Sequence, residues 1–393
     1  MESRVLPGPS ATAQGRGIAG PKGTLVVVNL VGGLDGLSLL VPFADRTYAA
    51  RRPGLAVASP GDRYGAIDLG RGLGLHPALQ PLYELAGRSD RLAVIGGVGV
   101  PDDQGGNRNH LPSREFVHRG GRQQSEGWAT RLLRFEGMGP EAVWSFGDGP
   151  HPMFDGLSSG HVGGGVGPIR PVTVGAQAAC AGVPLGAPTA AAAAPDAALD
   201  DIRWSDARWS SPADRLARGY PEGHLGRCLA TIVDMRRSDA GLRLVGIDHA
   251  GYDTHVDQGD GRSGVLAHKL DRLARALAAF WSEVSRGRDV EARRDDPVTV
   301  VVVSEFGRAI DENGSGGTEH GRGGVALAIG DQVVGGVHGD LPSMADDEVW
   351  PVGVDVRRVL ADAAASHGFR PWRGAVFPGL SLPNRSLGLL LSP

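Results

Sequence analysis

The sequence is poor in several residue types, and each scarcity excludes a class of protein. Its 393 residues include only two cysteines, Cys180 and Cys228, which lie far apart and form neither a CxxC pair nor a four-thiolate zinc site. No apolar run approaches the roughly 18 residues of a membrane-spanning helix. A thiolate zinc protein and a membrane-spanning protein are therefore excluded, and we expect no membrane partner.

An excess of charge of one sign is also missing. The chain has 40 basic and 44 acidic residues, a net charge of -4 at pH 7. This balance excludes a polybasic nucleic-acid binder and an acidic-tail protein. The first 22 residues lack the apolar segment of a secretory signal, so we interpret residues 1–22 as a flexible leader and expect a cytoplasmic protein.

Glycine, by contrast, is abundant, with 62 residues, more than twice the usual share of about 7%. The glycines have no G-X-Y period, which excludes collagen. Hydrophobic residues make up 41% of the chain, enough for a large core. We predict a single domain over residues 23–393, with a loop-rich insertion at about 148–224, where glycine-rich and Ala/Pro-rich stretches follow one another.

Five continuous apolar runs predict strands that are buried on both faces. Between them, apolar residues recur at three- and four-residue spacing, which predicts helices. Strands that alternate with helices indicate an α/β fold with a mainly parallel sheet. The predicted strands are 24–31, 92–97, 242–247, 298–303 and 325–330, and the predicted helices are 76–86, 265–284 and 355–367.

Acidic and histidine residues gather where these strands end or begin. In open α/β sheets ligands bind beyond the carboxyl ends of the strands, so we expect these side chains to converge on one crevice. Mixed nitrogen and oxygen ligands suit Zn or Mn better than Ca. The residues are Asp35, Asp253, His255, Glu305 and His320.

Each of these residues also has a simpler interpretation. Asp35 is followed by glycine and is compatible with a turn, and Glu305 has Arg308 nearby as an ion-pair partner. Asp253 and His255 are compatible with a helix N-cap or a buried hydrogen-bonded pair. Further histidines, His118 and His151 among them, have no polar company in the sequence, and we interpret them as structural or exposed.

A second polar group follows the predicted strand 92–97 and contains Arg108, His110 and Ser113. Arginine matches phosphate or sulfate oxygens in a fork, so Arg108 and His110 together could clamp an anion. The alternative is an ordinary hydrogen-bonded loop. The sequence contains no GxxxxGK[ST] loop, no HExxH and no GxSxG motif, so nucleotide-binding P-loop, zincin and α/β-hydrolase functions are not indicated.

Several of these stretches together resemble the family of proteins of unknown function DUF1501. They are VVVNLVGGLDGLSLLVPFAD, LHPALQPLYEL, GYDTH, SEFGRAIDENGSGGTEHG and GGVHGDLP, and the resemblance spans residues 24–147 and 242–367. The family is related to the alkaline phosphatase and sulfatase superfamily. The resemblance implies an alkaline-phosphatase-like α/β fold, with a central, mainly parallel sheet, helices on both faces and metal at its carboxyl edge.

The resemblance also implies ligands for one or two divalent ions, Zn, Mn or Mg. Asp253, His255 and His320 match one complete ligand set. Asp35 and Glu305 match a second set that has lost an imidazole, because Phe306 stands at the place of a histidine. Oxygen ligands alone favour a harder ion, so this second site is expected to be weak, Mg/Mn-like or empty.

Catalytic roles follow from the same resemblance. The family often has serine where this chain has Asn109, and an amide cannot replace a hydroxyl nucleophile. Ser113, with Ser38 as the second choice, is the expected nucleophile. His110 is expected to act as acid or base, and Arg108 and Arg308 to stabilise developing negative charge.

The expected function is that of a metal-dependent hydrolase or transferase acting on a small-molecule phosphate or sulfate ester. Two alternatives stay open: a non-hydrolytic binding or assembly protein on the same fold, and a repurposed metalloenzyme of specialised metabolism. The sequence does not indicate the oligomeric state.

Overall fold

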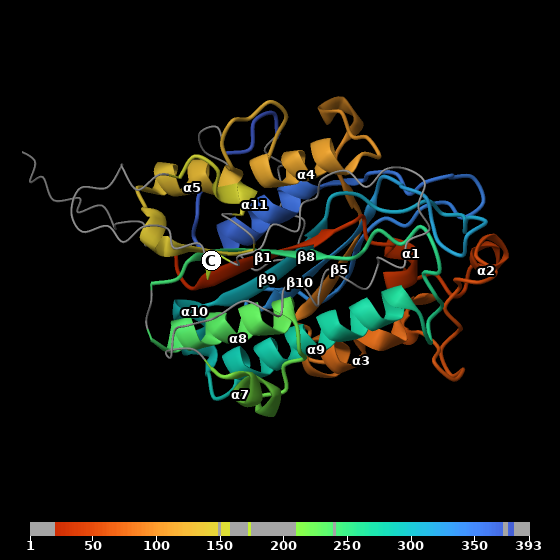
Figure 1. Ribbon diagram of the computed structural model, residues 1–393, viewed down its shortest axis with the longest axis horizontal. Coiled ribbons are helices and arrows are strands. Elements are labelled where there is room, and N and C mark those ends of the chain that lie inside the picture. Colours follow the sequence, from red (N-terminus) through yellow and green to blue (C-terminus); the bar gives the residue numbers. More distant parts are fainter. Residues whose placement is uncertain are drawn as a thin grey trace, which may run out of the picture.

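The computed structural model describes residues 20–147, 151–157, 172–173, 210–238, 241–371 and 376–380. Most of the predicted leader and of the predicted insertion therefore lies outside the described residues. A central sheet runs through the molecule between two layers of helices (Figure 1). None of the described helices is long and apolar enough to cross a membrane.

The central sheet is mixed but mainly parallel. Within the described residues only β10 runs antiparallel to its neighbours, β5 and β9, and the other pairs are parallel. In spatial order the strands are β11 (Gly336–Gly339), β5 (Leu92–Gly99), β10 (Gly324–Gly330), β9 (Val298–Ser304), β1 (Thr24–Val31), β8 (Leu244–Ala250), β6 (Val143–Gly147) and β7 (Val172–Thr173), with β12 (Val354–Asp355) also paired with β5.

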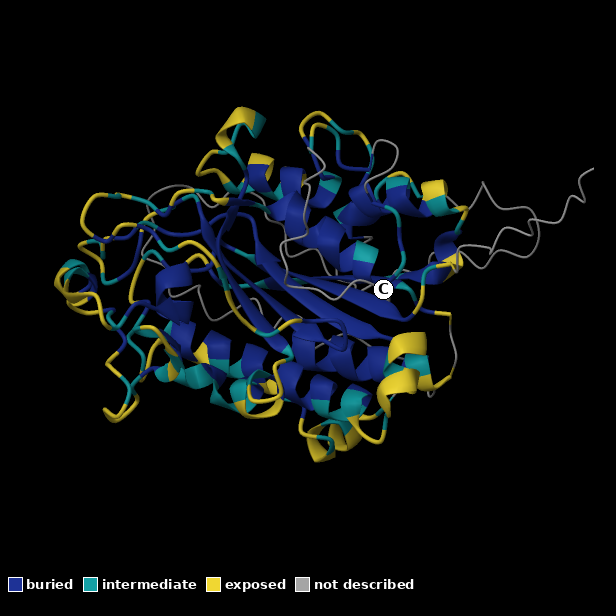
Figure 2. Ribbon diagram, turned by 180° about the vertical axis from the view of Figure 1, so that it is seen from behind, coloured by how far each residue is buried: buried dark blue, intermediate teal, exposed yellow. Residues whose placement is uncertain are grey.

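Alternate residues of β1 point into two separate cores, because successive side chains of a strand face opposite sides. Leu25 and Val27 pack with the helices on one face, while Val26 and Val28 pack with those on the other. Figure 2 shows the middle of the sheet buried and most exposed residues on the outer faces of the helices and in loops, while the edge strand β11 (Gly336–Gly339) is largely exposed. The first face carries α4 (His110–Arg119), α5 (Trp128–Glu136) and α11 (Val356–Ser366), and the second α3 (Gln80–Leu82), α8 (His224–Arg237) and α9 (Val265–Ser285).

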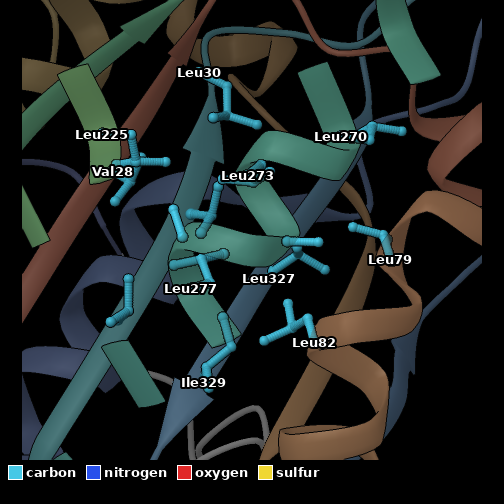
Figure 3. Packing of buried hydrophobic residues seen from close by; sticks show 14 of the residues in the cluster. Val28, Leu30, Leu79, Leu82, Leu225, Leu270, Leu273, Leu277, Leu327 and Ile329 are labelled. Carbon is cyan, nitrogen blue, oxygen red and sulfur yellow. The ribbon is translucent and has the colours of Figure 1, made fainter. Parts of the chain in front are cut away.

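The predicted α/β class and its central sheet between helices are confirmed. The apolar stripe of α9, with Leu270, Leu273 and Leu277, belongs to the same core as Val28 of β1 and Leu327 of β10 (Figure 3). The remaining elements are short: β2 (Leu40–Val41), β3 (Ile67–Gly70) and β4 (Leu73–Leu75) in a small sheet, α1 (Gly36–Leu39), α2 (Arg46–Arg51), α7 (Pro212–Ala217) and α10 (Val290–Asp295), and the single turns η1 (Pro77–Leu79), η2 (Tyr83–Gly87), η3 (Asp102–Gln104), η4 (Pro140–Ala142) and η5 (Pro152–Phe154).

Two predicted elements differ from the structure. The helix expected over 76–86 is a succession of three short turns, η1, α3 and η2. Pro77 and Pro81 lie in it, and a proline has no N–H to give to a continuous helix. The strand expected to end at Ile247 continues through Ala250, so Asp248 lies inside β8 rather than after it.

Candidate metal centre

The candidate centre lies at the carboxyl edge of the three adjacent parallel strands β9, β1 and β8. Asp253 follows β8 after a short loop, and Glu305 directly follows β9. His320 belongs to the segment that leads into β10. Because β10 is antiparallel to β9, it begins at the edge where β9 ends, so His320 reaches the same place. Asp253, Glu305 and His320 therefore lie at one edge of the sheet.

Glycine lets the backbone segments at this edge approach each other closely. Gly32 has a φ of +128°, and a Cβ there would lie 2.3 Å from the backbone N of Asp253. A Cβ on Gly317 would lie 2.3 Å from the carbonyl carbon of His255. Larger residues at these two positions would push apart the loops that carry Asp253 and His255. Some of the many glycines are therefore needed for the close packing of the loops at this edge.

Three histidines surround the Asp253 carboxylate. The Nε2 atoms of His255 and His320 lie 3.1 and 3.2 Å from Oδ1 of Asp253, and Nε2 of His110 lies 3.5 Å from Oδ2. The Nε2 atoms of His255 and His320 are 2.9 Å apart. We call His110, Asp253, His255 and His320 the Asp253 cluster.

The other ring nitrogen of each histidine faces an oxygen on the outside of the cluster. Nδ1 of His320 lies 2.7 Å from the carbonyl oxygen of Arg108, and Nδ1 of His110 lies 2.9 Å from Oε1 of Glu305. Nδ1 of His255 lies 3.4 Å from Oε2 of Glu319. A carbonyl oxygen only accepts, so Nδ1 of His320 donates to it, and Nε2 is the nitrogen that a metal ion could bind in place of a proton. Metal-binding histidines are held in this way.

The donor set fits a divalent metal ion. In a tetrahedral zinc site with metal–ligand distances of about 2.0–2.1 Å, the ligand atoms lie about 3.3–3.4 Å apart. The His–Asp separations in the Asp253 cluster lie close to that value. The ligand atoms of His110, Asp253 and His320 all lie within 4.8 Å of one another. Imidazole nitrogens with a carboxylate suit Zn or another late divalent metal better than Mg or Ca.

The electrostatics of the cluster also favour a cation. Hydrogen bonds to Asp253 and Glu305 raise the pKa of His110 to about 9, so without metal the ring carries a proton at neutral pH. Burial opposes ionisation of Asp253, but hydrogen bonds from the three histidines and the charge of Arg308 hold its pKa far below its usual value. The cluster thus holds positive charge where a metal ion would place it.

Phe306 fills the place where the resemblance implies a histidine. Its ring centroid lies 4.9 Å from that of His110 and 4.8 Å from that of His320. The ring is buried, and a Cβ on Gly33 would lie 2.3 Å from it. Phe306 contributes no ligand atom. Its ring instead packs against the imidazoles of His110 and His320 on one side of the cluster.

Asp35 lies in a separate buried network rather than in the cluster. Its Oδ2 accepts hydrogen bonds from Arg52, Ser38 and Gln258, each at 2.7 Å. Burial raises the pKa of Asp35, but the charge of Arg52 and these hydrogen bonds outweigh it and lower the pKa overall. Among the described residues no hydrogen bond or ion pair joins Asp35 to Glu305, and Oδ1 of Asp35 is buried without a hydrogen-bond partner.

Ser113 does not occupy the position of a nucleophile. Its side chain is only 2% exposed, and its hydroxyl lies 3.3 Å from two oxygens of Asn107. Ser38 is also buried and is hydrogen-bonded to Asp35. Asn109 caps α4, where its Oδ1 accepts from the backbone N of Leu111 at 3.1 Å. Neither predicted hydroxyl is directed at the Asp253 cluster.

The two arginines also differ from their expected roles. Arg308 is buried, and its guanidinium donates to backbone carbonyls and to Asp253. This arrangement positions Asp253 and leaves little of the guanidinium for a substrate anion. Arg108 is exposed, and it is its backbone carbonyl that holds His320.

Two outer partners of the cluster were missed from the sequence. Glu319 is adjacent to His320 in the sequence GTEHG, so its place near the cluster could have been predicted. The role of the Arg108 carbonyl could not, because every residue has a backbone carbonyl and only the fold determines which one contacts His320.

The family described as "Protein of unknown function (DUF1501)" matches the chain over residues 211–376. This confirms the resemblance in the part that carries Asp253, His255, Glu305 and His320. The match does not include His110. No curated protein matches the chain.

Solved structures with a similar overall arrangement are distant in sequence. One is that of Ps i-CgsB in complex with k-i-k-neocarrahexaose, at 10% identity, covering 89% of this chain and 72% of that one, with a TM-score of 0.40. Another is that of a 2-O GAG sulfatase, at 11% identity, covering 92% and 73%, with a TM-score of 0.37. Likenesses at this level say nothing of what this chain binds.

Proposed function

We propose that the chain is a metal-dependent hydrolase or transferase that acts on a small-molecule phosphate or sulfate ester. One observation carries the proposal: three imidazole Nε2 atoms face a single carboxylate at the carboxyl edge of the sheet, and each ring is anchored through Nδ1. The ester class comes from the resemblance to the phosphatase and sulfatase superfamily.

His110, Asp253, His255 and His320 would hold the ion, so His110 is proposed here as a ligand instead of the acid or base expected from the sequence. A bound divalent ion would polarise an ester oxygen and lower the pKa of a bound water. Around it, Glu305 and Glu319 orient two of the imidazoles, and Arg308 orients Asp253. Because Ser113 is buried and hydrogen-bonded, water is the better candidate for the attacking group.

The test is metal binding and turnover in matched variants. His255→Gln and His320→Gln each remove one ligand nitrogen, while His268→Gln changes an exposed histidine on α9 as a control. We expect Zn²⁺ affinity, measured by calorimetry on metal-free protein, to fall at least about 100-fold in the first two and to be unchanged in the control. Hydrolysis of a panel of phosphate and sulfate esters is expected to fall in parallel.

Wild-type metal affinity in both ligand variants would contradict the proposal. A second candidate function, a metal-binding protein without hydrolysis, is favoured by the burial of Ser113 and by the internal bonding of Arg308. Tight metal binding that is lost in His255→Gln, together with no turnover of any ester by the wild type, would support this second function over the first.

A further inference from the structure

A second group of potential metal ligands lies on the α4 face of the sheet, away from the Asp253 cluster. His118 is on α4, His151 precedes η5, and Asp248 and Asn29 face each other across the β8–β1 pair. The two imidazoles are 4% and 3% exposed, and Asn29 is fully buried. We call these four residues the Asp248 cluster.

The ligand atoms of this cluster are close together. Nε2 of His151 and Nε2 of His118 lie 3.3 and 3.7 Å from Oδ1 of Asp248. The two imidazole ring centroids are 4.7 Å apart, with an interplanar angle of 67°. The three ligand atoms all lie within 4.8 Å of one another. These separations are near the roughly 3.3–3.4 Å expected between ligands of a tetrahedral zinc ion.

Two buried polar atoms in the cluster make no hydrogen bond of good geometry: Oδ1 of Asn29, and Nε2 of His151, which lies near Asp248 only as an ion-pair contact at 3.3 Å. Leaving such an atom unsatisfied costs about 1–3 kcal/mol, so each calls for an explanation. The amide of Asn29 directs Nδ2 at Asp248 (2.9 Å) and at Nε2 of His118 (3.2 Å). In this orientation the amide donates to Oδ1 of Asp248 and to Nε2 of His118, as expected when no cation lies between those two atoms.

We propose that His118, His151 and Asp248 form a second divalent-cation site, selective for Zn²⁺ or a similar late metal. Rotation of the Asn29 amide by half a turn directs its orphan Oδ1 at the ion as a fourth ligand. Nδ1 of His151 accepts a long hydrogen bond, 3.4 Å, from the backbone N of Met153. Metal binding through Nε2 requires the ring proton to be on Nδ1, so this weak bond would be given up when the ion binds.

The site is largely buried but not closed to solvent. Asp248 is the one member with substantial solvent access, its side chain being 30% exposed, which gives an ion a route into the site.

This site is separate from the Asp253 cluster and is not the second ion of a catalytic pair. His110 and His118 are eight residues apart on α4, which places them about 12 Å apart along the helix axis. Paired catalytic ions lie about 3.5–4 Å apart. An ion at the Asp248 cluster would join β1, β8, α4 and the turn at His151, and its role is to stabilise the fold.

Cobalt titration of metal-free protein tests the proposal, because tetrahedral Co²⁺ absorbs strongly in the visible range. We expect two equivalents in the wild type, one in His151→Gln and one in His255→Gln, each variant reporting on one cluster. We also expect Co²⁺ to raise the melting temperature of His255→Gln. Unchanged stoichiometry in His151→Gln, or no binding at all in His255→Gln, would overturn the second site.

Anomalous scattering from crystals of wild-type protein grown with Zn²⁺ gives an answer that needs no variant to fold. A peak between His118 and His151, at about 2.0–2.1 Å from both Nε2 atoms, is the expected result. A peak at Asp253 with none at Asp248 would overturn this inference alone. A peak at Asp248 with none at Asp253 would instead contradict the proposed function and leave the inference standing.

Discussion

Arg308 is the residue on which the geometry of the Asp253 cluster depends most. Its buried guanidinium donates to the carbonyls of Gly33 and Thr318 and to the carboxylate of Asp253. The backbone of Arg308 also forms an isolated antiparallel β-bridge with that of His320. One side chain thus ties together the segments that follow β1, β8 and β9, and it does so without facing solvent.

Replacing Arg308 with methionine is expected to lower the free energy of unfolding by about 3–5 kcal/mol, because several buried carbonyls and a carboxylate lose their donor. The matched control is Arg275→Met, which breaks an exposed pair with Asp271 on α9 and should cost less than about 1 kcal/mol. Urea unfolding measures both. A similar small loss in the two variants would show that Arg308 is not the organising residue.

At the residue scale, the sequence predicted the members of the centre better than their roles. Asp253, His255 and His320 stand in short motifs, and the structure brings them into contact. The burial of Ser113 was not predictable, because it depends on which side of α4 faces Asn107. Asp248 and His151 were missed as a pair because they are almost a hundred residues apart in the sequence.

At the element scale, α4 is the structural link between the two clusters. It begins at His110 in the Asp253 cluster and carries His118 of the Asp248 cluster nearer its end. Its first turn is capped by Asn109, whose side chain accepts from the backbone N of Leu111. The start of this helix therefore sets the position of a proposed ligand.

Asn109→Ala is expected to destabilise the protein by about 1 kcal/mol, because the first turn of α4 loses its cap. Asn109→Ser, which keeps a capping oxygen, should stay within a few tenths of a kcal/mol of the wild type. Thermal unfolding followed by circular dichroism compares the three proteins. Equal losses in the alanine and serine variants would show that the side chain of Asn109 matters for something other than capping.

The elements themselves were largely predictable, but their directions were not. All five apolar runs form strands, because β-branched runs of this length are buried on both faces of a sheet. The antiparallel direction of β10 depends on pairing with β9 and β5, and nothing local in its sequence encodes it. The break-up of the helix over 76–86 was open to prediction from Pro77 and Pro81.

At the scale of the whole molecule, two buried neutral histidines make the fold sensitive to acid. Burial lowers the pKa of His76 and of His367 to about 4. Between pH 6.5 and pH 4 the folded protein binds fewer protons than the unfolded chain. The stability that these residues contribute is therefore present above pH 6.5 and is lost as the pH falls toward 4.

The loss is expected to be about 2 kcal/mol for each histidine between pH 7 and pH 5. His367→Gln keeps a donor for the carbonyl of Lys22, which His367 contacts at 2.9 Å, but removes the titrating group. The difference in unfolding free energy between the two pH values should shrink by about that amount in His367→Gln. It should not change in His268→Gln, and an unchanged difference in both would refute the assignment.

The antiparallel direction of β10 has a consequence for how the centre can change. Residues 305–323 connect β9 to β10. The two strands are adjacent and antiparallel, so this connection begins and ends at the same edge of the sheet. Glu305, Arg308, Glu319 and His320 all belong to it. Exchange of this stretch would reroute no crossover helix, provided that Arg308 keeps its contacts with Gly33 and Asp253 and that Gly317 keeps its close approach to His255. We expect adaptation to new ligands to proceed most readily by exchange of this segment.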